Sequence, residues 1–520
     1  MADVTTKSPI PTLASAPFDK ANADVILRSA DNVDFRVHKI VLALASPLFE
    51  DMFTLPQAAS EDVKHGGATI PVIPCPENNR TLDHLLRLCY PVDDPVHVMP
   101  MEIRDVLSAA AKYQMQEAVS LMRTALLRLA SIDPMAVYAV ACDLSLDLVA
   151  ERAARGFRSD PLDDYVPEMD HISAGAYYRL LQYRMASSPP AIFDFFGHDQ
   201  NGPSSPGGLD RAAATAVPSP QAVLPIFSSK GEGDLILRSR DGTDFHGLER
   251  LLSLASSIPL SSWPREQKDC SDQFPPIIFL AEHTVVLSRL LQLIYPMTEP
   301  LVEDMAEVVA LLEAAKKYQV QKVEEFARRK LMEKVGVHPL RVYLVAARFK
   351  WKREAKEAAR LAVYQTCDVY VPEMEMAPAQ AYRRFLEYRE QCRRVVSECI
   401  SEYVQPEKTQ SPPSPFGDLA ASLTSLLATV SQRGSEKSLF WNEKGYGDEL
   451  WPKIFTAIQP TSASTETQNR LHHIVYSTPR WRKTQNTTPP TQLSGFLTDV
   501  DKLEDSIRDA ITRIEFKLPT

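Results

Sequence analysis

The sequence has no apolar run that approaches the roughly 18 residues needed to cross a bilayer. Residues 1–17 lack the charged start and apolar core of a secretory signal peptide. A net charge of −10 argues against a general nucleic-acid-binding protein, which normally presents a basic face. We therefore expect an intracellular protein of the cytoplasm or nucleus, with neither membrane nor nucleic acid as a partner.

Recognisable catalytic and metal-binding motifs are also missing. The seven cysteines are scattered and form no Cys-x-x-Cys pair, so a zinc site has little support and reduced thiols are expected. The chain contains no Walker A motif, Gly-x-Ser-x-Gly, His-Glu-x-x-His or Gly-x-Gly-x-x-Gly. The neighbours His472 and His473 would point in different directions, which disfavours joint metal binding. We expect no catalytic residues, no cofactor and no metal, and hence not an enzyme.

What the sequence does contain is a long internal repeat, in which five blocks recur in the same order. Residues 24–35 match residues 234–245 at an offset of 210. The later blocks, at an offset of 205, pair 85–91 with 290–296, 111–116 with 316–321, 165–169 with 370–374, and 176–184 with 381–389. A period this long indicates a duplicated domain, because solenoid repeats have periods of only about 20–50 residues.

Within one copy, the pattern changes from strands to helices. Alternating apolar residues on either side of Asp31-Asn32 predict a hairpin, and Ser46-Pro47 is a typical helix start. Asp133-Pro134 opens a purely helical stretch. The expected elements are strands at 25–27, 35–37 and 68–73, and helices at 39–45, from 47, at 81–90, 103–113, 119–129 and 174–184. Each copy is therefore predicted to have an α+β fold followed by an all-helical extension.

These patterns divide the chain into seven expected segments. The stretch between the copies is rich in Pro, Gly and Ser, which is typical of a linker. The segments are a disordered N-terminus 1–17, a first module 18–131, a helical extension 132–186, a linker 187–230, a degenerate second module 231–335, a second helical extension 336–405, and a mostly disordered tail 406–520 with short helices near 418–431 and 497–514.

The first module resembles the BTB/POZ family, and the whole chain resembles tandem BTB/POZ proteins. The likeness rests on Asp24-Val-Ile-Leu27, on Phe35-Arg-Val-His-Lys39, and on Ser46-Pro-Leu-Phe49 followed by Met52-Phe53. The combination Met-Phe-x-Leu-Pro and then Pro-Val-Asp-Asp-Pro is similar to BTB proteins of mushroom-type (basidiomycete) fungi. The signature positions are Asp24, Phe35, His38, Lys39, Ser46, Pro47, Phe49, Met52, Phe53, Asp234 and Phe245.

The resemblance implies that Asp24 and Lys39 form a partly buried ion pair. The second copy keeps Asp234 but has Glu249 at the position of the lysine, and Arg250 is one residue further on. Two interpretations stay open: Arg250 replaces the missing cation, or both aspartates simply lie at a strand start near solvent. The second copy also loses Ser-Pro-x-Phe, so we expect the first copy to bear the partner surface.

The resemblance further implies a non-catalytic protein–protein interaction scaffold. The alternatives are a substrate adaptor for a cullin-3-type ubiquitin ligase and a transcriptional regulator that recruits corepressors. Cullin-binding members carry an apolar-x-Glu element after the Met-Phe helix, whereas this chain has Thr54-Leu-Pro-Gln57. The expected partners are other proteins, including cullin-3 or another BTB module, in a homodimer or in a pseudo-dimer of the two copies.

Near the C-terminus, apolar residues follow a four-three alternation typical of a short coiled-coil seam. Two interpretations stay open for this helix: it docks on its own domain, or it binds a partner. The residues of the candidate partner-binding helix are Phe496, Val500, Leu503, Ile507 and Ile514.

Overall fold

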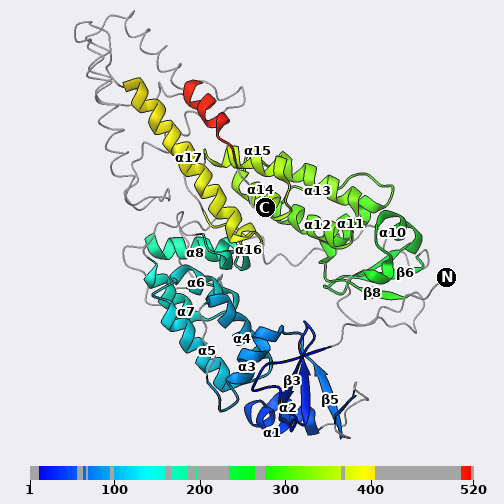
Figure 1. Cartoon of the computed structure of the whole chain (residues 1–520). Helices are drawn as coiled ribbons and strands as arrows, with labels where there is room; N and C mark the ends of the chain where they lie inside the picture. The colour runs from blue at the N-terminus through cyan, green and yellow to red at the C-terminus, as the bar shows by residue number, and fades with distance from the viewer. Residues whose placement is uncertain are drawn as a thin grey trace, which may run out of the picture. The chain divides into compact units, whose positions relative to one another are not determined.

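A computed structural model describes ten stretches of the chain, and its helices and strands are labelled in Figure 1. The described residues are 11–54, 62–65, 68–93, 99–157, 165–185, 194–196, 233–263, 276–364, 369–404 and 505–516. They form two compact units. The first comprises residues 1–200 with Pro378–Arg383, and the second comprises residues 201–377 with 384–520.

The first unit is built around a small mixed sheet with the strand order β1-β3-β2-β5-β4. The central strand β2 pairs antiparallel with β3 and parallel with β5. Because Val25, Ile26 and Leu27 are all buried, the middle of this sheet is covered on both faces. The strands are β1 Thr12–Leu13, β2 Val25–Arg28, β3 Val33–Val37, β4 Asp62–His65 and β5 Ala68–Pro74.

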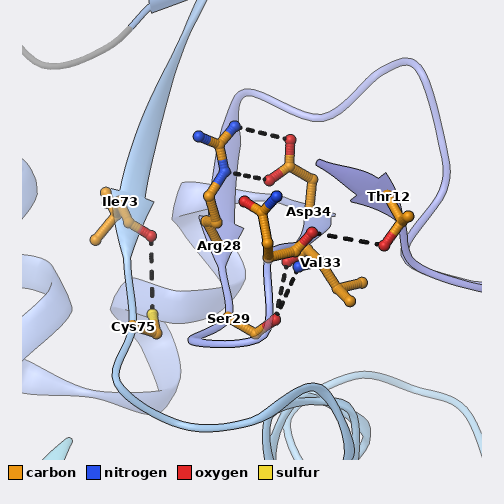
Figure 2. A network of polar contacts seen from close by, with 8 residues as sticks. Thr12, Arg28, Ser29, Val33, Asp34, Ile73 and Cys75 are labelled. Carbon is orange, nitrogen blue, oxygen red and sulfur yellow. Dashed lines mark hydrogen bonds and ion pairs between the residues drawn. The ribbon is translucent and has the colours of Figure 1, made fainter. Parts of the chain in front are cut away.

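The predicted hairpin joins β2 to β3, as Figure 2 shows. Asn32 has a φ of 64°, a left-handed conformation that asparagine tolerates in tight turns. Just beyond the turn, Arg28 donates two hydrogen bonds to Asp34, with Nε···Oδ1 at 2.7 Å and Nη2···Oδ2 at 3.1 Å. This bidentate pair joins the two strands across the sheet and pins their register.

The N-terminal segment is a correction to the prediction of a disordered stretch over 1–17. Residues 1–10 lie outside the described part, but β1 adds to the sheet edge, with the Thr12 and Ala14 amides donating to carbonyls of Asn32 and Asp34 at 3.0 Å each. Phe18 is fully buried and packs edge-on against Tyr90. Prolines disfavour long strands, but a two-residue strand between Pro11 and Pro17 needs few amide donors.

Helices cover the sheet and begin largely where local signals place them. Ser46-Pro47 opens α2 as predicted, and Asn78 caps α3 by accepting a hydrogen bond from the Thr81 amide at 2.8 Å. The third helix ends at Arg87, before the predicted stop at Pro91. The helices are α1 Lys39–Ala45, α2 Pro47–Thr54, α3 Asn79–Arg87, α4 Pro100–Lys112 and α5 Gln116–Leu129.

The helical extension follows at the predicted cap, where Asp133 accepts from the Ala136 amide at 3.3 Å. It consists of α6 Pro134–Asp143, α7 Asp147–Gly156, the short 3-10 helix η1 Pro167–His171 and α8 Ala174–Met185. Residues 194–196 belong to the predicted linker, yet Phe195 is 1% exposed and packs on this extension. The linker prediction was therefore wrong at this point, because composition alone does not reveal a single buried side chain.

The second unit contains a smaller sheet with the order β7-β6-β8, in which β6 pairs antiparallel with β7 and parallel with β8. Its register reproduces that of β3-β2-β5: Leu237 faces Phe245 and Ile278, as Leu27 faces Phe35 and Ile73. The turn residue is Gly242, with a φ of 80°. The strands are β6 Leu235–Arg238, β7 Asp244–Gly247 and β8 Ile277–Phe279.

The helices of the second unit follow in the same succession. They are α10 Glu249–Ala255, the 3-10 helix η3 Leu260–Ser262, α11 Thr284–Ile294, α12 Met305–Lys317, α13 Gln321–Glu333, α14 Pro339–Arg348, α15 Lys352–Ala362, α16 Glu373–Met376 and α17 Ala379–Val404, of which residues 379–383 belong to the first unit. Where the first copy has the helix α2, the second has η3, whose Leu260 and the adjacent Trp263 are buried. The loss of Ser-Pro-x-Phe thus coincides with the loss of a regular helix.

The C-terminal tail is described only over 505–516, so the predicted helix near 418–431 lies outside the described residues. A helix is present at 505–513, with Ile507 and Ile511 buried on one face. Phe516 packs against Tyr343 of α14 and Tyr388 of α17. All three residues belong to the second unit, and the C-terminal helix is coloured red in Figure 1. These contacts correspond to the interpretation in which the helix docks on its own domain.

Candidate interaction surface

The start of α1 is held by two side chains from other elements. The N-cap residue His38 makes no capping hydrogen bond with its own side chain. Instead, the Lys39 amide donates to Asp24 Oδ1 at 2.7 Å, and the His38 amide donates to the Tyr90 hydroxyl at 2.8 Å. Two of the amides that a helix leaves unpaired at its N-terminus are thereby satisfied.

This arrangement corrects the expected Asp24–Lys39 ion pair. The carboxylate of Asp24 binds the backbone of Lys39, whereas the Lys39 ammonium lies 5.7 Å from the centre of the Phe53 ring. Asp24 is exposed beside the start of β2, as the alternative interpretation expected. The carboxylate needs only an amide from the helix, so the side chain at position 39 is free to vary.

The second unit shows the same geometry without the lysine. The Glu249 amide donates to Asp234 Oδ1 at 2.7 Å, and the Leu248 amide donates to the Tyr295 hydroxyl at 2.7 Å. A glutamate fits at this position because its backbone N–H makes the contact. Arg250 is therefore not needed as a replacement cation.

Ser46 acts at the start of α2 as predicted, and it also makes a contact that the sequence did not reveal. Its Oγ accepts from the Phe49 amide at 3.2 Å and donates to the Tyr113 carbonyl at 2.5 Å. In the second unit, Ser256 Oγ donates to the Tyr318 carbonyl at 2.7 Å and accepts from Trp263 Nε1 at 3.2 Å. The serine therefore ties the loop before this helix to the end of a later helix.

A partly buried glutamate beside these residues was missed by sequence reasoning. Tyr113 Oη donates to Glu77 Oε2 at 2.6 Å, and Lys112 Nζ lies 2.8 Å from Glu77 Oε1. Glu282 has the equivalent contacts with Tyr318 and, at 2.8 Å, with Lys317. The repeat itself was the usable signal, since both tyrosines fall in blocks that recur.

The other signature residues divide into core and surface. Phe35, Phe245 and Phe49 are buried, and the Phe49 ring stacks on Tyr113 at 5.2 Å. Pro47 is exposed, and the Met-Phe pair, Met52 and Phe53, is half-buried. These residues mostly build the fold, and the core members leave no side chain available for a partner.

The exposed face of α1 is different. Ile40 is 69% exposed and Leu44 is 85% exposed, and residues four apart lie on the same face of a helix. At the equivalent positions the second unit has Arg250 and Leu254, so the charged residue interrupts the stripe there. We call Ile40 and Leu44 the α1 patch, because an exposed apolar pair on one helix face is a candidate contact surface.

The predicted partner-binding helix is described only in part. Phe496, Val500 and Leu503 lie outside the described residues. Ile507 is buried and Ile514 is half-buried within the second unit, to which this helix belongs.

Two thiols of the first unit are poorly suited to nucleophilic chemistry. Burial raises the pKa of both Cys75 and Cys89 to about 11, which disfavours the reactive thiolate. Among the described residues, no group of three or more His, Cys, Asp or Glu side chains is arranged to hold a metal ion.

None of the helices in the described stretches is both long enough and apolar enough to cross a membrane.

Comparison with known proteins gives one family. A search of curated proteins finds no match for the chain. The model of the BTB/POZ domain matches residues 16–129, which span β2 to β5, the α1 patch and the helices up to α5. Residues 16–129 are thus a BTB/POZ domain, a module that generally mediates protein–protein interaction.

Proposed function

We propose that the protein is an interaction scaffold whose BTB/POZ domain binds a second copy of the chain through the α1 patch. The observation that carries this proposal is the exposure of Ile40 and Leu44 on one face of a short helix within the matched domain. Burying such side chains contributes roughly 1.5–3 kcal/mol each. A second copy is the natural occupant because BTB/POZ domains associate with one another.

Residues 231–335 would be a second, diverged BTB/POZ module. The shared register of β6-β7-β8 and the repeated contacts of Asp234, Tyr295 and Ser256 support this proposal. Its α1-like helix carries Arg250 at the position of Ile40, and a guanidinium at the centre of an apolar contact would have to be desolvated. The first copy would therefore bear the partner surface, and the second would not.

The test is the mass of the full chain in solution. Light scattering across micromolar concentrations should approach twice the chain mass of 58.1 kDa for the unmodified protein. The double variant Ile40→Glu/Leu44→Glu should remain at the monomer mass, because charges in the contact would lose their hydration. Leu254→Glu is the matched control, since Leu254 is 77% exposed at the equivalent position of the second unit, and it should dimerise normally. An unmodified chain that stays monomeric, or a double variant that dimerises, would contradict the proposal.

A cullin-3 adaptor is the second candidate function. It is favoured by the helical extension α6–α8, which directly follows the BTB/POZ domain and could complete a cullin-binding surface. The loop that should carry the apolar-x-Glu element, residues 55–61, lies outside the described residues. Titration of the full chain with purified cullin-3 tests this function, and no measurable binding at tens of micromolar would remove it.

A further inference from the structure

Each helical extension contains an aromatic socket that holds one phenylalanine. In the first unit, Phe195 lies between Tyr138 of α6 and Tyr183 of α8, with ring centres 5.9 Å and 5.1 Å apart. The Tyr138 ring meets Phe195 at 74°, an edge-on contact of the kind that aromatic pairs prefer. We call this pair of tyrosines socket 1.

The second unit contains socket 2, formed by Tyr343 of α14 and Tyr388 of α17. Phe516 lies 5.7 Å from the Tyr343 ring and 4.9 Å from the Tyr388 ring, at interplanar angles of 75° and 72°. The two socket tyrosines are the repeat equivalents of Tyr138 and Tyr183 at the offset of 205. The sockets therefore recur with the repeat.

The phenylalanines that fill the sockets do not recur with the repeat. Phe195 follows the second tyrosine of its socket by 12 residues, whereas Phe516 follows Tyr388 by 128 residues. The two occupants share a short sequence pattern. An acidic residue directly precedes each phenylalanine: Asp194 in one and Glu515 in the other. Two unrelated segments in equivalent sockets indicate that the socket selects its ligand.

The occupants differ in how well they fit. Phe195 is 1% exposed, and its carbonyl accepts a hydrogen bond from Arg179 Nε at 2.8 Å. Phe516 is 8% exposed. The equivalent arginine, Arg384, has a buried Nε that makes no hydrogen bond within the described part of the chain. An unsatisfied buried donor is costly, so the tail segment is the less complete ligand.

We propose that socket 2 is an exchangeable peptide-binding site for an acidic residue followed by phenylalanine, and that residues 505–516 are a displaceable occupant. A better ligand would bury its phenylalanine between Tyr343 and Tyr388 and offer its backbone carbonyl to Arg384. The inference deepens the proposed scaffold function by adding a second partner site. It does not depend on the α1 patch.

The probe for this site is a fluorescein-labelled peptide with the sequence of residues 190–199, which contains Asp194-Phe195. Fluorescence anisotropy compares its affinity for the unmodified full chain and for Phe516→Ala, in which socket 2 is vacated. Socket 1 keeps its own occupant in both proteins, so the difference reports on socket 2. We expect the variant to bind the probe at least tenfold more tightly, and Arg513→Ala, which leaves Phe516 in place, to behave as the unmodified chain.

Two further measurements separate specific binding from a loosened structure. The same peptide with Phe195→Ala should lose at least tenfold in affinity for the Phe516→Ala chain, and adding Arg384→Met to that chain should weaken the original probe several-fold. Should Phe516→Ala fail to fold, saturating probe on the unmodified chain should instead speed amide hydrogen exchange over 505–513. Equal affinity of the probe for the unmodified and Phe516→Ala chains, or equal affinity of both peptides, would overturn the proposal. The dimer mass would be unaffected by either result, which keeps this test separate from that of the α1 patch.

Discussion

Replacing Asp24 and replacing Lys39 should have very different consequences, because only the aspartate side chain is used at the start of α1. Asp24→Ala removes the acceptor of the Lys39 amide. Loss of a capping side chain typically costs about 1 kcal/mol, within a range of roughly 0.5–2 kcal/mol. Asp24 is exposed, which places the expected value near the middle of that range. Lys39→Met leaves the backbone contact intact and should change stability by less than about 0.5 kcal/mol.

Amide hydrogen exchange measured by mass spectrometry reports this difference locally. A loss of about 1 kcal/mol corresponds to roughly fivefold faster exchange of the amides at the start of α1 when the helix opens locally. The melting temperature of the first unit should fall by about 2–4 °C. Asp234→Ala is an internal counterpart, since the same change should appear in α10, whose first residue is Glu249.

Comparing the two variants shows whether Asp24 acts on the backbone of α1 or on the Lys39 side chain. Because only the aspartate side chain caps the helix, Asp24→Ala should accelerate exchange at α1, and Lys39→Met should not. An equal loss from both variants would mean that the two charges interact, and the backbone-capping account would be refuted.

Three other perturbations should have measurable effects. Ser46→Ala should destabilise the first unit by about 1–3 kcal/mol, because the Phe49 amide loses its acceptor; urea titration would measure it, and no change would contradict the buried contact. Phe195→Ala should cost about 3–5 kcal/mol in the first unit by emptying socket 1, and Phe196→Ala, a half-buried neighbour, should cost clearly less. The raised pKa of Cys75 means that the folded state favours the neutral thiol: its stabilisation is complete below pH 9.0 and is lost as pH rises toward about 11, at most about 3 kcal/mol. The melting temperature should therefore fall less steeply between pH 8 and pH 10.5 for Cys75→Ala than for the unmodified chain. The same dependence of melting temperature on pH in both proteins would argue against this source of alkaline instability.

Local signals predicted much of the fold. Hairpin turns at Asn32 and Gly242 were predictable because few residues adopt a positive φ easily. Ser46-Pro47 and Asp133-Pro134 marked helix starts because cap and proline act within a few residues. Helix ends were less predictable: α3 stops at Arg87, and a later proline is only an upper limit on its length.

The candidate surfaces could be predicted only in part. The BTB/POZ signature directed attention to Lys39, but in the structure the lysine backbone makes the contact and the side chain lies near Phe53. The α1 patch was not identified from sequence because apolar residues on a short helix are usually assigned to the core. Exposure of Ile40 and Leu44 depends on which face of α1 packs against the rest of the domain.

By itself, the sequence determined the five recurring blocks, the α+β order of elements and the BTB/POZ character of residues 16–129, since these rest on local pattern and repeated residues. The tertiary structure alone decided which groups meet across long separations. Phe195 was assigned to a linker and residues 505–516 to a tail, yet each delivers a phenylalanine to a tyrosine socket. The physical reason is that a socket forms only when two helices pack together. The apolar periodicity of either helix does not specify which distant phenylalanine fills it.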